Sequence, residues 1–178
     1  MPANLTDVRA YYDKNTPLFL RFGSSPETQT IHRSLWPQGI RRLEDALAVS
    51  NNLILDEART LGLPHPQIVD LGCGVGATLF HVLAGLGAGR GVGVTLSAVQ
   101  ARLAESTRQS LSFSNAAFLQ GDFHHVPLKK SFDLVYSIEA FIHAQHPDQY
   151  LNEVVRLLKP GGRLILLDDF YVPTSSDY

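Results

Sequence analysis

Asp70-Leu71-Gly72-Cys73-Gly74-Val75-Gly76 is the stretch that decides the fold. It continues a short apolar run that begins at Gln67, and it precedes a segment with helical periodicity that extends to Leu86. Glycines in such a strand-to-helix turn let the backbone pass close to a ligand, because no side chain is in the way. Open α/β sheets bind ligands at the carboxyl ends of their strands. The stretch therefore predicts an α/β protein with a ligand site at its first turn.

Strands and helices alternate from residue 67 onward, which predicts a parallel sheet with right-handed crossovers. The expected strands are residues 67–71, 91–96, 117–120, 132–137 and 163–167. The expected helices are residues 76–86, 98–108 and 147–158. Ser97 is placed to cap the second helix, and Pro160-Gly161-Gly162 to end the third.

Residues 1–62 have a helical character instead. Thr6 is a candidate N-cap for a first helix, and a loop is expected at Gly23–Pro26. A second helix is expected to start near Pro37 and to stop at Gly62. Its apolar stripe comprises Ile40, Leu43, Leu47, Ile54 and Leu55.

Composition excludes several classes of function. The chain has 178 residues, a formal net charge of -2 and one cysteine. It is therefore expected to form one domain, without a basic surface for nucleic acid and without an intramolecular disulfide. No secretory signal and no apolar run of about 20 residues is present, so a cytoplasmic protein that does not bind membranes is expected. No metal site is expected, because neighbours such as His124 and His125 point apart in an extended segment.

Two cofactors compete for the glycine turn. A dinucleotide requires G-x-G-x-x-G, because its pyrophosphate lies on the helix N-terminus. The spacing from Gly72 is G-x-G-x-G, and the Asp70 carboxylate would repel a pyrophosphate. The same carboxylate can orient the amine of S-adenosylmethionine, directly or through water. A tight turn without a ligand is the alternative.

The turn resembles the first motif of class I S-adenosylmethionine-dependent methyltransferases. Two further stretches are similar to that family in order and spacing: Gly121-Asp122-Phe123, and Leu157-Leu158-Lys159-Pro160-Gly161-Gly162. The resemblance covers residue 67 to about residue 170. It implies a Rossmann-like doubly wound sheet, with five parallel strands present in the order 3-2-1-4-5. It also implies that Asp122 meets the adenine amine while Phe123 lies against the ring.

One departure from the family concerns the end of the second strand, where most members carry an acid that holds the ribose. Here the sequence is Gly93-Val94-Thr95-Leu96-Ser97, with Gln100 a turn later. This resembles the G-V-T-L-S-x-x-Q variant of cyclopropane synthases and some small-molecule methyltransferases. It implies a ribose contact from Gln100 and backbone contacts from Thr95 and Leu96. Alternatively, Thr95 is only a strand residue and Ser97 only a cap. The cofactor-binding residues implied are Asp70, Gly72, Cys73, Gly74, Thr95, Leu96, Gln100, Gly121, Asp122, Phe123 and Ser137.

The stretch Tyr136–Ala144 resembles the Y-x-I-E-A-x-x-H-A segment of the C-methyltransferases that act on sterol side chains. Glu139 and His143 would share one face if this turn is helical. Methyl transfer to an alkene produces a carbocation, which Glu139 is expected to stabilise or deprotonate. His143 is expected to relay the proton or orient Glu139. For an oxygen or nitrogen acceptor the pair would act as a base. The alternatives are that Glu139 only binds the cofactor or caps a helix, and that His143 only packs.

The N-terminal region is similar to the same subgroup in Tyr11-Tyr12-Asp13, Thr16, Phe22–Ser25 and Ile31-His32. The resemblance implies that residues 1–62 form a helical lid over a cofactor-binding core of residues 63–178. It also implies that Tyr12 lines the transferring methyl group. Arg41 and Arg42 are expected to be solvated, or else to meet an anionic acceptor such as a prenyl diphosphate.

The function expected is therefore methyl transfer from S-adenosylmethionine to a small-molecule acceptor, with a carbon of an isoprenoid or other unsaturated compound as one option. The alternative is a truncated or degenerate module that binds the cofactor without turnover, because the family's sheet has seven strands and this chain stops after the fifth. A nicotinamide-dependent dehydrogenase is a third option. An unpaired edge at residues 163–167 predicts a homodimer or aggregation.

Overall fold

The computed structural model describes residues 4–22 and 29–170. Its five strands are parallel and lie in the order β3-β2-β1-β4-β5, which confirms the predicted fold. The strands are β1 (Gln67–Leu71), β2 (Arg90–Thr95), β3 (Ala116–Gln120), β4 (Phe132–Ile138) and β5 (Leu158–Leu167). The helices are α1 (Leu5–Phe22), α2 (Leu43–Thr60), α3 (Ala77–Leu86), α4 (Ala98–Ser110), the 3-10 turn η1 (Phe141–His143) and α5 (Pro147–Leu157).

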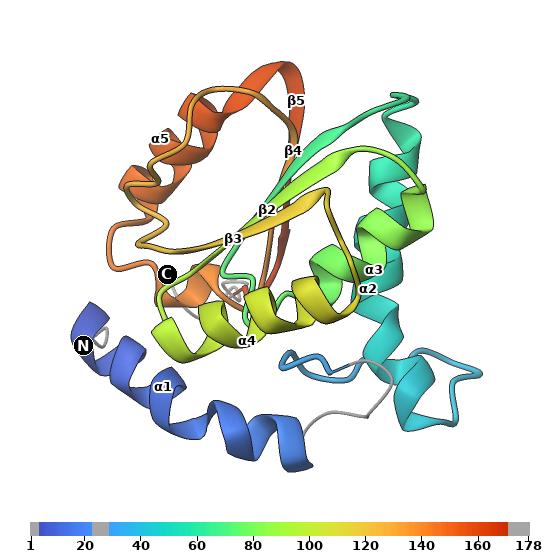
Figure 1. Cartoon of the computed structure of the whole chain (residues 1–178), viewed down its shortest axis with the longest axis vertical. Coiled ribbons are helices and arrows are strands. Elements are labelled where there is room, and N and C mark those ends of the chain that lie inside the picture. The colour runs from blue at the N-terminus through green and yellow to red at the C-terminus, as the bar shows by residue number, and fades with distance from the viewer. Residues whose placement is uncertain (1–3, 23–28, 171–178) are drawn as a thin grey trace, which may run out of the picture.

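Side chains of neighbouring residues on each strand point to opposite faces of the sheet. Helices cover both faces. Ile68 and Leu134 are fully buried in one core with side chains of α2 and α3. Val69 and Val135 are fully buried in a second core with side chains of α5. Figure 1 shows α5 on the opposite side of the sheet from α2 and α3. Helix α2 thus belongs to the core, although it falls within the segment 1–62 that was predicted as a lid.

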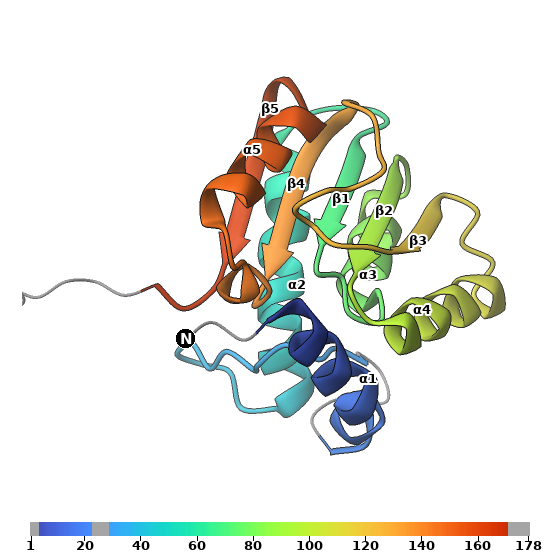
Figure 2. The same ribbon diagram turned by 90° about the vertical axis from the view of Figure 1, so that its left-hand side faces the viewer.

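Helix α1 lies at the carboxyl edge of the sheet. In Figure 2 the strand arrowheads point toward α1 and toward the segment that follows residue 29. Asp13 of α1 accepts hydrogen bonds from the Ser97 hydroxyl at 2.5 Å and from the Val99 N–H at 3.2 Å. Ser97 in turn accepts the Gln100 N–H at 3.1 Å and so caps α4 as predicted. The first helix is therefore anchored where α4 begins.

Two predicted helix starts are wrong. The first helix is capped by Asn4 instead of Thr6, because the Asn4 side chain accepts the Asp7 N–H at 2.9 Å. The second helix begins at Leu43 instead of near Pro37. Pro37 opens a turn in which its carbonyl accepts the Ile40 N–H, and Gly39 has a φ of 96°, which a helix does not tolerate. The loop predicted at Gly23–Pro26 lies outside the described residues.

Strand β5 is longer than predicted, and its pairing with β4 is irregular. Leu158 is the partner of Phe132, and Arg163 is the partner of Leu134, so Lys159–Gly162 form a bulge inside the strand. Lys159 is held there by Asp133, with Nζ–O distances of 2.9 and 2.8 Å. Among the described residues, the other edge of β5 has no strand beside it, and the homodimer stays a prediction. No helix in residues 4–22 and 29–170 is long and apolar enough to cross a membrane.

Candidate active site

A cleft of about 940 Å³, counting its open mouth, lies at the carboxyl edge of the sheet. Twelve of the fourteen residues predicted for the site line it. They are Tyr12, Asp70, Gly72, Cys73, Gly74, Thr95, Leu96, Gln100, Asp122, Phe123, Glu139 and His143. Gly121 and Ser137 are not among its lining residues. The structure thus gathers predicted residues from position 12 to position 143 around one cavity.

The glycine turn forms the floor of the cleft. The amides of Gly72 and Cys73 both donate to the Val94 carbonyl, which ties the turn to β2. Gly72 has a φ of 95°, and a Cβ there would lie 2.2 Å from the Ala140 Cβ. Gly74 has a φ of 55°, and a Cβ there would meet only Ile31, at 3.7 Å. Gly72 is therefore required by close packing, whereas Gly74 leaves open space for a ligand.

Cys73 is buried within this turn, and burial raises the pKa of its thiol well above the ordinary value. A thiol that stays protonated is a poor nucleophile. Cys73 therefore acts as a small side chain in a tight turn.

Asp70 is a buried carboxyl group at the end of β1, with 3% of its surface exposed. Burial raises its pKa to about 7, and the nearby Tyr136 hydroxyl partly opposes that rise. A desolvated carboxylate gains most from a cation placed beside it. The position therefore fits the ammonium end of S-adenosylmethionine.

Thr95 and Gln100 form a buried polar network beside the glycine turn. The Thr95 hydroxyl donates to Gln100 Oε1 at 2.7 Å, and Gln100 Nε2 donates to the Thr16 hydroxyl at 3.2 Å. The Thr16 hydroxyl donates to the Tyr12 carbonyl at 2.6 Å. Nε2 carries a second hydrogen, which is the group available for a ribose hydroxyl. The network also links this subsite to α1.

Asp122 and Phe123 follow β3 at the next strand end. The Asp122 Oδ1 atom accepts the backbone N–H of His124 at 2.9 Å and lies 2.7 Å from the His124 ring Nδ1. Phe123 packs edge-on against Tyr150, with ring centroids 5.2 Å apart. This pairing of a carboxylate with an apolar ring fits an adenine base.

Tyr12 of α1 and His143 of the turn η1 meet in the lining of the cleft. The Tyr12 hydroxyl and His143 Nε2 share a hydrogen bond of 2.9 Å, although they lie 131 residues apart in the sequence. Burial raises the pKa of Tyr12 to about 12. Burial also lowers the pKa of His143, and the Asp168 carboxylate partly offsets that effect. At neutral pH the pair is therefore a protonated phenol beside a neutral imidazole.

Glu139 is not on a helix with His143, which corrects the idea of a shared helical face. Its φ is 51°, and the turn η1 begins only at Phe141. The amide of Glu139 is held by the Leu167 carbonyl, so β5 positions the residue. Its carboxylate accepts the Arg33 N–H at 3.1 and 3.2 Å and pairs with Arg33 Nε at 3.2 Å. The tertiary structure therefore places Glu139 against the segment that covers the cleft.

Residues 30–32 also belong to the lining of the cleft, and they were not among the predicted site residues. Thr30, Ile31 and His32 all line the cleft. His32 Nε2 donates to Asn51 Oδ1 at 3.0 Å, and the same oxygen accepts the Thr78 hydroxyl at 2.7 Å. The resemblance of Ile31-His32 to a lid was the available signal, but it did not indicate a lining role.

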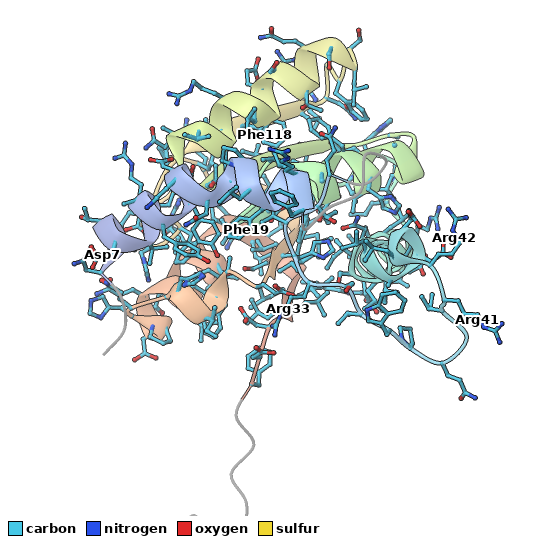
Figure 3. All side chains as sticks on the ribbon, turned by 90° about the horizontal axis from the view of Figure 1, so that it is seen from below. Asp7, Phe19, Arg33, Arg41, Arg42 and Phe118 are labelled. Carbon is cyan, nitrogen blue, oxygen red and sulfur yellow. The ribbon has the colours of Figure 1, made fainter. Side chains whose placement is uncertain are left out.

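Arg41 and Arg42 lie away from the cleft. Figure 3 shows both at the edge of the molecule, far from Arg33, with side chains directed outward. Arg42 pairs with Glu44 at 3.5 Å. They therefore match the solvated alternative better than a role in binding an anionic acceptor. Within the described ranges, no three histidine, cysteine or acidic side chains lie close enough together to hold a metal ion.

Residues 69–166 match the family model of the methyltransferase domain, and the chain belongs to that family. It is 29% identical over 159 residues to tocopherol O-methyltransferase of Arabidopsis thaliana, covering 88% of this chain and 41% of that protein. It is 32% identical over 163 residues to a sterol 24-C-methyltransferase of Gibberella zeae, covering 90% of this chain and 40% of that protein. The match thus spans about two fifths of the length of these relatives.

Two solved structures share the fold. The 4+2 cyclase SpnF superposes with a TM-score of 0.82 at 26% identity, covering 93% of this chain and 61% of that chain. Geranyl diphosphate C-methyltransferase of Streptomyces coelicolor superposes with a TM-score of 0.77 at 21% identity, covering 93% of this chain and 66% of that chain. The arrangement of strands and helices is therefore one that this chain shares with both structures.

Proposed function

We propose that this protein transfers a methyl group from S-adenosylmethionine to a small molecule, and that the acceptor atom is a carbon of an isoprenoid-like, unsaturated compound. One observation carries the proposal: a single cleft joins the glycine turn of the methyltransferase family to Tyr12, His143 and Glu139. The names of both relatives support an isoprenoid-like acceptor, a tocopherol or a sterol, and the name sterol 24-C-methyltransferase supports carbon as the acceptor atom, whereas tocopherol O-methyltransferase names oxygen.

The cofactor is held by residues from three strand ends in this proposal. Asp70 takes the ammonium group, the network of Thr95 and Gln100 takes the ribose, and Asp122 with Phe123 takes the adenine. Gly74 supplies the open space between them, because nothing but Ile31 lies near its missing Cβ. S-adenosylmethionine, when bound, supplies an electrophilic methyl group.

The remaining residues handle charge and protons on the acceptor. A carbocation on the acceptor is stabilised by the aromatic face of Tyr12 and by the negative charge of Glu139. The proton that the cation loses can reach neutral His143 through Tyr12: the Tyr12 oxygen accepts that proton while its own hydroxyl proton moves to His143 Nε2, the ring nitrogen that has the lone pair. Tyr12 stays protonated and donates to His143 Nε2, which holds the imidazole in one orientation.

We also propose a cytoplasmic location and a small-molecule partner in preference to nucleic acid. The formal net charge of -2 supports the small-molecule partner, because nucleic-acid binding relies on an excess of cations. Arg41 and Arg42 lie at the periphery and do not form a basic patch over the cleft.

The test is a labelled methyl-transfer assay with S-adenosylmethionine and a panel of acceptors. The panel contains a sterol with an unsaturated side chain, geranyl diphosphate, a phenol and an amine. We expect a product with a new carbon–carbon bond from an unsaturated acceptor, identified by mass spectrometry. Tight binding of S-adenosylhomocysteine without any product would favour the cofactor-binding module. Transfer to the phenol or amine alone would overturn the carbon acceptor.

A further inference from the structure

His124 is a buried histidine that the proposed reaction does not use. It is 4% exposed, and its Nε2 atom has no hydrogen-bond partner among the described residues. A buried polar atom without a partner costs free energy, so a purely structural site favours an apolar side chain. This cost indicates that the imidazole has a role through its other nitrogen, Nδ1.

That other nitrogen, Nδ1, lies 2.7 Å from Asp122 Oδ1. A carboxylate accepts hydrogen bonds, so Nδ1 carries the proton and donates. The backbone N–H of His124 donates to the same oxygen at 2.9 Å. Two donors on Oδ1 fix the plane of the carboxylate, and neither hydrogen bond uses Oδ2.

The imidazole is itself held in place by aromatic neighbours. Its centroid lies 4.9 Å from that of Phe123 and 6.3 Å from that of His146. Phe123 is in turn packed edge-on against fully buried Tyr150. Asp122 is thus oriented by a ring that is itself packed among other rings.

We propose that His124 is a positioning residue that makes the cleft select a 6-amino purine over a 6-oxo purine. The inference rests on the proposed function, in which Asp122 meets the adenine amine. An oriented carboxylate accepts from an exocyclic amine but repels the carbonyl oxygen that inosine has at the same place. Without His124 the carboxylate can rotate, and the discrimination falls.

The experiment compares the affinity of S-adenosylhomocysteine with that of S-inosylhomocysteine by calorimetry. We expect the unmodified protein to favour the adenine ligand by about tenfold or more. His124→Leu should bring this ratio close to one. His124→Asn should keep most of it, because the asparagine amide places a donor near the position of Nδ1. His124→Gln, whose amide reaches the place of Nε2 instead, should not.

Neighbouring His125 is exposed and supplies the matched control, since only its backbone N–H contacts Asp122. His125→Leu should leave the ratio unchanged. Asp122→Asn is an independent test: its Oδ1 still accepts from His124, so its amide N–H₂ takes the place of Oδ2. That amide can donate to the inosine carbonyl, and the preference should move toward S-inosylhomocysteine.

The outcomes separate the inference from the function on which it rests. If the unmodified protein binds neither ligand, the proposed function fails, and the inference fails with it. If it binds and discriminates, but His124→Leu keeps the ratio or weakens both ligands equally, His124 only supports the loop and the inference alone is wrong. Thermal unfolding shows which variants are folded. If His124→Leu does not fold, the comparison of His124→Asn with His124→Gln, together with Asp122→Asn, decides.

Discussion

The backbone N–H of Arg33 donates to both carboxylate oxygens of Glu139, across 106 residues of sequence. The Arg33 guanidinium adds an ion pair to the same carboxylate, and a second one to Asp169 at 2.8 Å. The segment over the cleft is therefore fastened to the ends of β4 and β5. The Glu139 carboxylate, which is proposed to act on the acceptor, therefore also binds Arg33, next to the residues 30–32 that line the cleft.

Glu139→Gln removes the proposed catalytic charge and the Arg33 ion pair but keeps the hydrogen bond from the Arg33 N–H. The amide still accepts the Arg33 N–H, but it has no charge to stabilise a cation or to take a proton. We expect turnover to fall by about 100-fold or more, with the Kd of S-adenosylhomocysteine nearly unchanged. Glu44→Gln, on the surface, is the control. Arg33→Ala removes only the ion pairs, and we expect a modest rise in cofactor dissociation rate from it. Unchanged turnover in Glu139→Gln would show that Glu139 only binds Arg33 and does not act on the acceptor.

Tyr12 and His143 are expected to act as a unit in turnover. Tyr12→Phe removes the hydroxyl that shares the 2.9 Å hydrogen bond, and His143→Gln removes the proton acceptor. Each single change should lower kcat, and the double variant should be no slower than the slower single one, because the residues serve one step. Steady-state kinetics on the four forms measure the coupling. Fully additive losses would show that the two residues act separately.

Gly74→Val tests the cofactor site. A valine side chain fills the space above the turn and also faces the strain of a φ of 55°. S-adenosylhomocysteine should raise the Tm of the unmodified protein, since a ligand that binds only the folded state stabilises it. In Gly74→Val the shift should vanish. Gly39→Val is the control for strain, because Gly39 has a φ of 96° and no atom within 4 Å of its missing Cβ. A retained shift in Gly74→Val would contradict the site.

Asp70 should make both stability and binding depend on pH. Its pKa is raised from 3.8 to about 7 in the folded protein. Its contribution to the free energy of unfolding is therefore fully present below the unfolded value and is lost as the pH rises through 7. Binding has the opposite sign, because an ammonium group requires the ionised carboxylate. Affinity for S-adenosylhomocysteine should weaken as the pH falls below 7, by up to about tenfold per unit.

Calorimetry between about pH 5.5 and 8.5 measures this dependence. Asp70→Asn should flatten it, whereas Asp56→Asn, on an exposed helix face, should not. The difference between these two variants removes the contribution of other titrating groups such as His143. A pH profile that is the same in Asp70→Asn and in the unmodified protein would show that Asp70 does not meet the ligand's cation.

The sheet and the glycine turn could be predicted from the sequence, because both depend on residues that are neighbours in sequence. Apolar runs bounded by turn residues identify each strand, and parallel order follows from the helices between them. The two wrong helix starts were also local: Asn4 caps the first helix instead of Thr6, and the turn at Gly39 delays the second helix until Leu43. The hydrophobic pattern alone does not show which of two nearby residues starts a helix.

The sequence by itself therefore determined the family, the strand order and the residues at the strand ends. Only the tertiary structure decided which distant side chains meet there: Asp13 with Ser97, Arg33 with Glu139, and Tyr12 with His143. It also placed Glu139 outside a helix, with a positive φ at the point where its amide donates to the Leu167 carbonyl of β5. The physical reason is the sequence separation over which each kind of interaction acts. Periodicity and turn chemistry act over a few residues, whereas a contact across 84 to 131 residues forms only when packing brings two elements to the same edge of the sheet.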